Sequence, residues 1–176
     1  MKRNVKRYLE LSINAALVCF LLFTVGRYFS TYLDARQYVG KQLQLDGLSH
    51  VSAEPGSETK TDLQSHTAFI FFATWCGPCL VELGRVNSAV QDGELDPSRI
   101  AAISIDDSEA EVIDYLAESK LPIPTYFDNS RIASRSIGLR STPTIVYLDA
   151  EQNIADISSG LSLFLVNKLR DSYDQK

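Results

Sequence analysis

The chain has 176 residues, 45% of them hydrophobic, which suffices for one globular domain whose buried core needs no disulfide scaffold. Its formal net charge at pH 7 is -5, but from Tyr28 onward 12 basic residues stand against 21 acidic ones, a balance of -9. Phosphate backbones are bound by basic surfaces, so we expect no nucleic-acid partner.

The N-terminus carries a membrane-targeting pattern. Four basic residues lie within the first seven, and residues 11–26 contain no charge. As a helix this stretch would rise about 24 Å, slightly less than the ~30 Å hydrocarbon core, so Tyr8, Leu9 and the stem of Arg27 would complete the span. We therefore predict a basic cytoplasmic tail over residues 1–8 and an uncleaved transmembrane signal anchor over residues 9–30, with the following domain outside the cytoplasm.

Two alternatives to this anchor are open. A cleaved signal peptide is disfavoured because no Ala-x-Ala site follows the apolar run, and the Thr-Val-Gly of residues 24–26 is a weak substitute. A buried amphipathic helix of the domain would not need the flanking charge asymmetry. Cys19 lies within the predicted span, where a thiol behaves as a small apolar group, so we expect no catalytic role for it.

The next part of the chain leads into a domain. Residues 31–48 are predicted to form a stalk and the entry to a domain over residues 49–176, and turn formers dominate residues 52–62. Residues 68–73 are a continuous apolar run, typical of a strand buried on both faces. We expect a helix to begin at or just after Cys76.

The remaining pattern alternates strands with helices. A second apolar run at residues 100–105 predicts a strand, and the helix expected over residues 108–120 would open with Ser108 and Glu111 as a capping box. The later elements are predicted as a strand at 124–128, a helix at 129–137, strands at 144–149 and 154–158, and a helix at 161–173. This order implies an α/β three-layer sandwich.

Two cysteines stand at the start of the first domain helix, in the sequence Trp-Cys-Gly-Pro-Cys at residues 75–79. Structural zinc needs four ligands, and both histidines precede the motif without ligand spacing. Residue 80 is Leu where c-type haem attachment requires His. A purely structural disulfide would close too small a loop to stabilise the chain much. We therefore predict that the two cysteines form a redox pair.

The helix start gives the two cysteines unequal roles. Free N–H groups and the helix dipole favour the thiolate of Cys76, and Pro78 suits the first turn. Cys76 is thus the expected nucleophile, which attacks a substrate disulfide to form a mixed disulfide. Cys79, one turn further along, is the expected resolving thiol.

Several segments resemble the thioredoxin superfamily, and specifically its membrane-anchored TlpA/ResA-like branch. They are residues 71–79 with Glu82, residues 103–107, residues 126–128 and residues 137–144. The resemblance covers roughly residues 40–169. It implies a thioredoxin-like sandwich with a central mixed sheet, in which the segment between residues 105 and 137 supplies an extra helix and strand.

The resemblance also implies a substrate-binding surface. Pro143 is expected to be cis and to pack beside the cysteines, with Thr142 offering backbone hydrogen bonds to an extended substrate. From the residues alone, Thr-Pro before a strand is also an ordinary strand-entry turn. Trp75 is expected to cover the cysteines and line the contact surface, although a buried packing role is the alternative.

The sequence departs from the family pattern at two points, Ile70 and Gly84. Ile70 stands where thioredoxins carry a buried Asp, so the base that deprotonates the resolving thiol is unassigned. Glu82, three residues after Cys79, is a candidate for that proton transfer, and an exposed helix carboxylate is the alternative. Gly84 replaces a kink-forming proline.

These features together predict an extracytoplasmic protein-disulfide reductase, as used in cytochrome c maturation or in protection against metal or oxidative stress. Its substrates would be protein thiols and disulfides, and a membrane electron donor would re-reduce it. We expect a monomer in a bacterial inner membrane, with no metal and no cofactor beyond the Cys76–Cys79 pair.

Four other functions are compatible with parts of this pattern. A thiol oxidant would use the same motif in the opposite direction. A copper-binding module of the Sco type would want Cys-x-x-x-Cys and a later His, and no His follows residue 66. A peroxiredoxin-type peroxidase lacks its signature, since Ala73 occupies the Thr position. A non-catalytic interaction domain would not need intact Cys76, Cys79 and Pro143.

Overall fold

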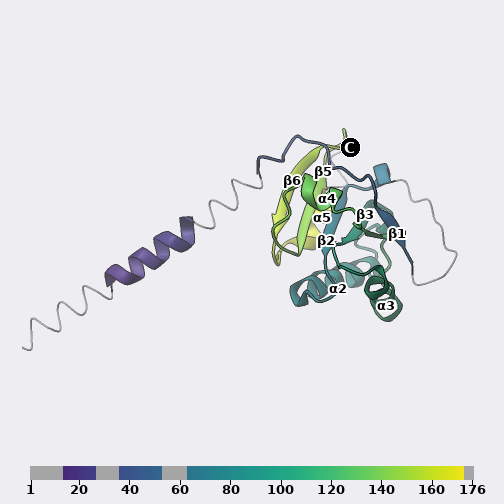
Figure 1. The fold of residues 1–176 in the computed structure, drawn as a ribbon, viewed down its shortest axis with the longest axis horizontal. Helices are drawn as coiled ribbons and strands as arrows, with labels where there is room; N and C mark the ends of the chain where they lie inside the picture. Colours follow the sequence, from purple (N-terminus) through teal and green to yellow (C-terminus); the bar gives the residue numbers. More distant parts are fainter. Residues whose placement is uncertain (1–13, 27–35, 53–62, 173–176) are drawn as a thin grey trace, which may run out of the picture. The chain divides into compact units, whose positions relative to one another are not determined.

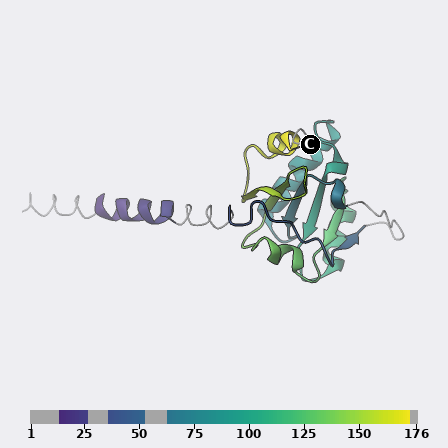
Figure 2. The same ribbon diagram turned by 90° about the horizontal axis from the view of Figure 1, so that it is seen from above.

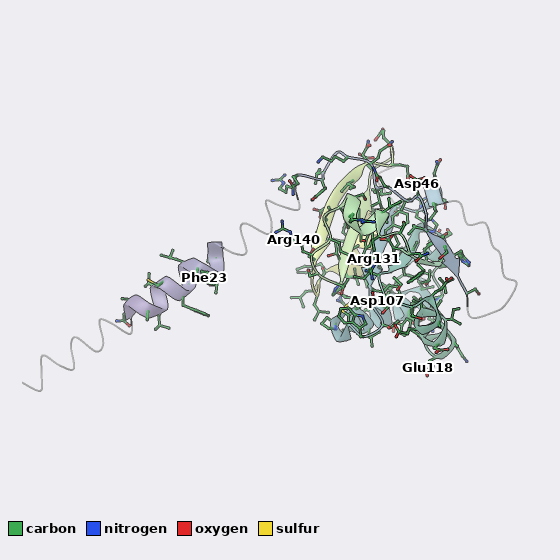
Figure 3. The ribbon with its side chains drawn as sticks, viewed as in Figure 1. Phe23, Asp46, Asp107, Glu118, Arg131 and Arg140 are labelled. Carbon is green, nitrogen blue, oxygen red and sulfur yellow. A yellow bond between two sulfur atoms is a disulfide. The ribbon has the colours of Figure 1, made fainter. Side chains whose placement is uncertain are left out.

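The computed structural model describes residues 14–26, 36–52 and 63–172, and the chain divides into two compact units, Met1–Gln37 and Tyr38–Lys176. In the first unit residues 14–26 form a helix that exposes large apolar side chains, among them Phe23 (Figure 3). Within the three described ranges, no helix combines the length and the apolar character needed to cross a membrane. The other parts of the predicted anchor, residues 9–13 and 27–30, lie outside the described residues.

The second unit is built on a mixed sheet with the strand order β1-β4-β3-β2-β5-β6 (Figure 1). The strands are β1 (Ser49–Val51), β2 (Ala68–Phe72), β3 (Ile100–Ser104), β4 (Thr125–Phe127), β5 (Thr144–Leu148) and β6 (Ile154–Ser159). The central strands β2, β3 and β4 run parallel, whereas β1, β5 and β6 pair antiparallel with their neighbours. The carboxyl ends of β2 and β3 therefore open onto the same edge of the sheet.

Helices cover both faces of this sheet (Figures 1 and 2). They are α2 (Gly77–Gln91), α3 (Glu109–Ser119), α4 (Ile132–Ser136) and α5 (Leu165–Asp171), with short 3-10 turns at Leu63–Ser65 and Pro97–Arg99. Because side chains alternate along a strand, Ile70 packs with α2, α3 and α5, and Phe71 packs with α4 on the other face. The predicted three-layer α/β sandwich with a mixed sheet is confirmed.

Three helix starts differ from the prediction. The helix α4 begins at Ile132 rather than at residue 129. Ser108 lies at the N-cap of α3, but its side chain makes no capping hydrogen bond, so the capping box with Glu111 is not formed. Glu109 and Glu111 instead place negative charge in the first turn, which favours a helix N-terminus. The last helix begins at Leu165 rather than near Leu161. Residues 161–164 are held outside it by contacts with α2, described below.

The chain enters the sandwich before the first predicted strand. Gly40 donates a backbone hydrogen bond to Ile154 (2.8 Å), and Leu43 is buried in the core on the α4 side. Tyr38 lies against Gly138, where a Cβ would come within 2.1 Å of the tyrosine oxygen, so this approach requires glycine. The second unit accordingly begins at Tyr38.

Candidate active site

The cysteine pair lies where β2 gives way to α2. Cys76 is the N-cap residue of α2, and Pro78 occupies the first turn, so the predicted helix start is confirmed. Cys76 and Cys79 form a disulfide with a Cα–Cα distance of 5.2 Å. The Cys79 N–H also donates to the Sγ atom of Cys76 over 3.3 Å. A backbone donor aimed at this sulfur favours its thiolate form once the disulfide is reduced.

The two sulfurs differ in access to solvent. Cys76 is 6% exposed to solvent, while Cys79 is fully buried in the core on the α2 side. A substrate disulfide can therefore approach only the Cys76 side of the pair. This difference agrees with the predicted roles of Cys76 as nucleophile and Cys79 as resolving thiol.

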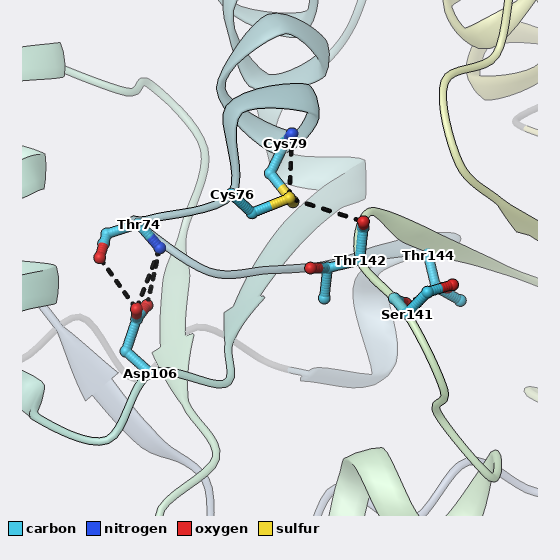
Figure 4. Close-up of a disulfide and its surroundings, with 7 residues drawn as sticks. All are labelled: Thr74, Cys76, Cys79, Asp106, Ser141, Thr142 and Thr144. Carbon is cyan, nitrogen blue, oxygen red and sulfur yellow. Dashed lines mark hydrogen bonds between the residues drawn. A yellow bond between two sulfur atoms is a disulfide. The ribbon is translucent and has the colours of Figure 1, made fainter.

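A proline loop lies directly beside the disulfide. The Thr142–Pro143 peptide bond is cis, as the resemblance implied. The carbonyl oxygen of Thr142 is 3.5 Å from the Sγ atom of Cys76 (Figure 4). On the far side of the loop, Gly160 donates its N–H to the Pro143 carbonyl (2.8 Å). The loop thus joins the disulfide to the segment that follows β6.

Trp75, the residue before Cys76, presents its side chain to solvent. The indole is 74% exposed, which excludes the alternative of a buried packing residue. An exposed aromatic next to the nucleophile offers a large apolar surface at small conformational cost. It is consistent with the predicted contact surface for a protein partner.

Glu82 is buried rather than exposed, so the alternative of an exposed helix carboxylate is wrong. One of its oxygens accepts the backbone N–H of Ser162, and the other pairs with Arg85 at 2.9 Å. Arg85 also donates to the carbonyl oxygens of Ser162 and Leu163. Among the residues that the structure describes, no hydrogen bond joins Glu82 to Cys79. The carboxylate links α2 to residues 162–163, and its part in proton transfer stays a prediction.

Asp106 is a site residue to which the sequence assigned no role. It is 2% exposed and follows β3, at the sheet edge where β2 leads to the cysteines. Its carboxylate accepts the N–H of Thr74 (3.0 Å) and the Thr74 hydroxyl (2.8 Å) (Figure 4). It also accepts the Ser104 hydroxyl (2.6 Å). Asp106 therefore fixes the backbone two residues before Cys76. The sequence signal for Asp106 is its position directly after the apolar run at residues 100–105, and that position alone does not indicate whether the carboxylate is buried.

The side chain of Ile70 in β2 is fully buried among apolar groups, at the position where thioredoxins carry a buried Asp.

The phenol of Tyr147 lies in the same core cluster. Burial raises the pKa of Tyr147, and the negative charges of Asp156 and Glu82 raise it further. Tyr147 therefore stays protonated at neutral pH and cannot serve as a base there.

The described ranges contain no group of three or more His, Cys, Asp or Glu side chains placed to hold a metal ion. The sulfur pair supports chemistry of its own. A nucleophilic sulfur at a helix N-terminus, a buried partner sulfur and a neighbouring backbone acceptor form a unit for thiol-disulfide exchange.

Comparison with known proteins agrees with this geometry. The family model described as Redoxin matches residues 39–162. A search of curated proteins finds no match. Among solved structures, StoA from Bacillus subtilis is similar at 20% identity and a TM-score of 0.54, with 62% of this chain and 83% of that chain covered.

Two solution structures are similar in the same way. A putative thioredoxin from Neisseria meningitidis aligns at 19% identity and a TM-score of 0.55, covering 66% of this chain and 81% of the other. An uncharacterized thioredoxin-like protein from Porphyromonas gingivalis aligns at 22% identity and a TM-score of 0.51, covering 65% and 77%. At these identities the likeness establishes a thioredoxin-like fold.

Proposed function

Because the chain belongs to the Redoxin family, we propose that it is an extracytoplasmic protein-disulfide reductase whose Cys76 and Cys79 cycle between dithiol and disulfide. The observation that carries this proposal is the asymmetry of the pair. Cys76 caps α2 beside the Thr142–Pro143 loop, and Cys79 is buried behind it. In such an arrangement a substrate disulfide reacts with Cys76, and Cys79 then resolves the mixed disulfide.

The proposed reaction proceeds in two exchanges. The Cys76 thiolate attacks one sulfur of the substrate disulfide, the substrate S–S bond breaks, and the departing thiolate takes a proton. The Cys79 thiolate then attacks the Sγ atom of Cys76 in the mixed disulfide and releases the second substrate thiol. Two electrons have passed to the substrate, and the Cys76–Cys79 disulfide is left for a membrane electron donor to reduce.

Substrate and proton handling are assigned to the residues around the pair. Thr142 and Pro143 border Cys76 and would bind the backbone of the substrate, while the exposed Trp75 would contact its side chains. Glu82 is the candidate for proton transfer to and from Cys79, since it lies on the next turn of α2 and is fully buried. No cofactor beyond the disulfide is needed for these steps.

Reduction is preferred over oxidation because the Gly-Pro between the cysteines resembles that of reducing thioredoxins. We expect the reduced protein to reduce insulin disulfides, and its potential to lie near the value of about -270 mV typical of thioredoxin. Equilibration with glutathione buffers, followed by thiol alkylation and mass spectrometry, measures that potential. A value near the roughly -120 mV of strong oxidases would overturn reduction in favour of the thiol-oxidant alternative.

The location proposed for the protein is a bacterial inner membrane, with a single anchor over residues 9–30 and the domain on the periplasmic or extracytoplasmic side. The basic N-terminus, the uncharged stretch and the helix over residues 14–26 support it. A monomer would leave the Cys76 side free for protein substrates and for the donor.

Membrane extraction tests this location. The full chain is expected to stay in the membrane pellet after alkaline carbonate treatment, and its domain to be digested by protease added to spheroplasts. A variant without residues 1–30 is the control and should be soluble. Recovery of the full chain in the carbonate supernatant would contradict the anchor.

A further inference from the structure

A groove of about 470 Å³ lies between α2 and the chain at the start of α5. Val81 and Gly84 contribute from α2, and Leu163, Phe164 and Val166 contribute from the opposite side. Several of these apolar side chains face solvent: Val81 is 54% exposed, Phe164 66% and Leu163 87%. Apolar side chains gathered around an open groove are typical of a binding surface.

Both walls of the groove follow in sequence from residues at the active site. On α2, Val81 follows Cys79 by two residues. On the other wall, residues 161–164 follow Gly160, whose N–H is bonded to the carbonyl of Pro143 beside Cys76. Both walls therefore begin within a few residues of groups that contact the disulfide, and a peptide bound at Cys76 is placed to extend toward the groove.

Two charged side chains hold the second wall in place. Glu82 accepts the Ser162 N–H, and Arg85 donates to the carbonyl oxygens of Ser162 and Leu163 while pairing with Glu82. The backbone of this segment is thus satisfied by side chains from α2, and the side chain of Leu163 remains outside the core. A fixed wall with exposed apolar side chains is preorganised for binding, which lowers the entropy cost of docking.

The far end of the groove is acidic. Asp92 and Glu94 lie there, at and beyond the C-terminus of α2. Arg170 is paired with Glu94 at 3.7 Å, and Arg85 is engaged by Glu82. Within the described residues Asp92 has no ion pair, so the end of the groove carries uncompensated negative charge. A basic side chain complements it.

We propose that this groove docks an extended segment of the protein substrate next to its reactive cysteine, with apolar side chains near the cysteine and a basic residue further along. The proposal rests on the proposed function. It makes Leu163, Phe164 and Asp92 residues that determine which substrates are preferred, while the exchange chemistry stays with the two cysteines.

Gly84 provides a test that should spare the fold. A Cβ built at this position meets no atom within 4 Å, so the space above it belongs to the groove. Gly84→Leu would fill that space, and leucine favours a helix interior over glycine. Gly84→Ala is the matched control, because it gives a similar gain in helix propensity with little filling. Leu163→Ser with Phe164→Ser removes the opposite wall at exposed positions.

The probe is the symmetric disulfide of the peptide Cys-Gly-Leu-Phe-Gly-Lys, reduced by stoichiometric reduced protein of full length. One protein dithiol is oxidised for every two peptide thiols released. Gly84→Leu and the double serine variant are each expected to lower the second-order rate constant at least about tenfold, because the buried leucine and phenylalanine contacts are lost. The rate with hydroxyethyl disulfide, which is too small to reach the groove, should change less than about twofold in the same variants.

Charge reversal tests the acidic end. Asp92→Lys should slow the lysine peptide and speed a peptide in which glutamate replaces lysine. Equal rates for the Leu-Phe peptide and a Ser-Ser peptide with the unaltered protein would overturn the groove proposal. So would light scattering that shows the serine variants converting a dimer to a monomer without a change in peptide rate, since the groove would then join two copies of the chain. Failure of the unaltered protein to reduce even hydroxyethyl disulfide would instead refute the proposed function.

Discussion

Cys76→Ser is expected to lower the rate of insulin reduction at least about a thousandfold, to the level of the uncatalysed exchange. A serine hydroxyl at the N-cap of α2 cannot supply the sulfur nucleophile or form a mixed disulfide. Cys79 is fully buried, so it cannot replace Cys76 at the surface. The measurement is the turbidity of reduced insulin chains, with dithiothreitol as the electron source.

Cys79→Ser separates the two exchanges. This variant keeps the nucleophile but lacks the resolving thiol, so the mixed disulfide on Cys76 should accumulate and be visible by mass spectrometry under non-reducing conditions. The Cys76→Ser variant is the control and should trap nothing. Trapping on Cys79 in the Cys76→Ser variant, at a rate equal to that on Cys76, would reverse the assigned roles.

Asp106→Ala is expected to lower the free energy of unfolding by about 3 kcal/mol, because hydrogen bonds to a buried carboxylate are lost together. The Thr74 N–H, the Thr74 hydroxyl and the Ser104 hydroxyl would each lose their acceptor. Urea unfolding of the oxidised protein measures the change. A loosened Thr74 backbone should also reduce the rate of insulin reduction, since it precedes Cys76 by two residues.

The neighbouring Asp107 supplies the control. Its side chain is 99% exposed and pairs with Arg131 at 2.8 Å, and the two lie side by side in Figure 3. Asp107→Ala should cost less than about 0.5 kcal/mol, as exposed ion pairs contribute little. Equal losses for the two alanine variants would contradict the positioning role of Asp106, because charge alone would then account for both.

The central elements could be predicted from the sequence because burial leaves a local signal. Strands covered on both faces carry continuous apolar runs, and β2 and β3 both do. The strand β1 has no such signal: it has only three residues, lies at the sheet edge and is partly exposed. Its place depends on pairing with β4, more than 70 residues later.

The residues of the candidate site also differ in whether the local sequence indicates their role. Cys76 and Cys79 could be named because the residues around the pair disfavour zinc and haem and leave redox chemistry. Pro143 could be named only through the resemblance to the thioredoxin superfamily. The environment of Glu82 could not be predicted, because its partner Ser162 lies 80 residues away in the sequence. The apolar pattern around Ser162 predicts a helix from Leu161, although α5 begins at Leu165. Asp106 was missed because a carboxylate after a strand looks the same in sequence whether it faces solvent or accepts three donors.

The burial of Cys79 has a kinetic consequence. In the proposed cycle only Cys76 meets other molecules, so electrons from the donor and electrons to the substrate pass through the same sulfur, and both partners need the surface around it. They can therefore only take turns, and each excludes the other while it is bound. A high concentration of oxidised substrate would slow its own reduction, because bound substrate would keep the donor away from Cys76. The turnover rate would then depend on the relative concentrations and affinities of substrate and donor.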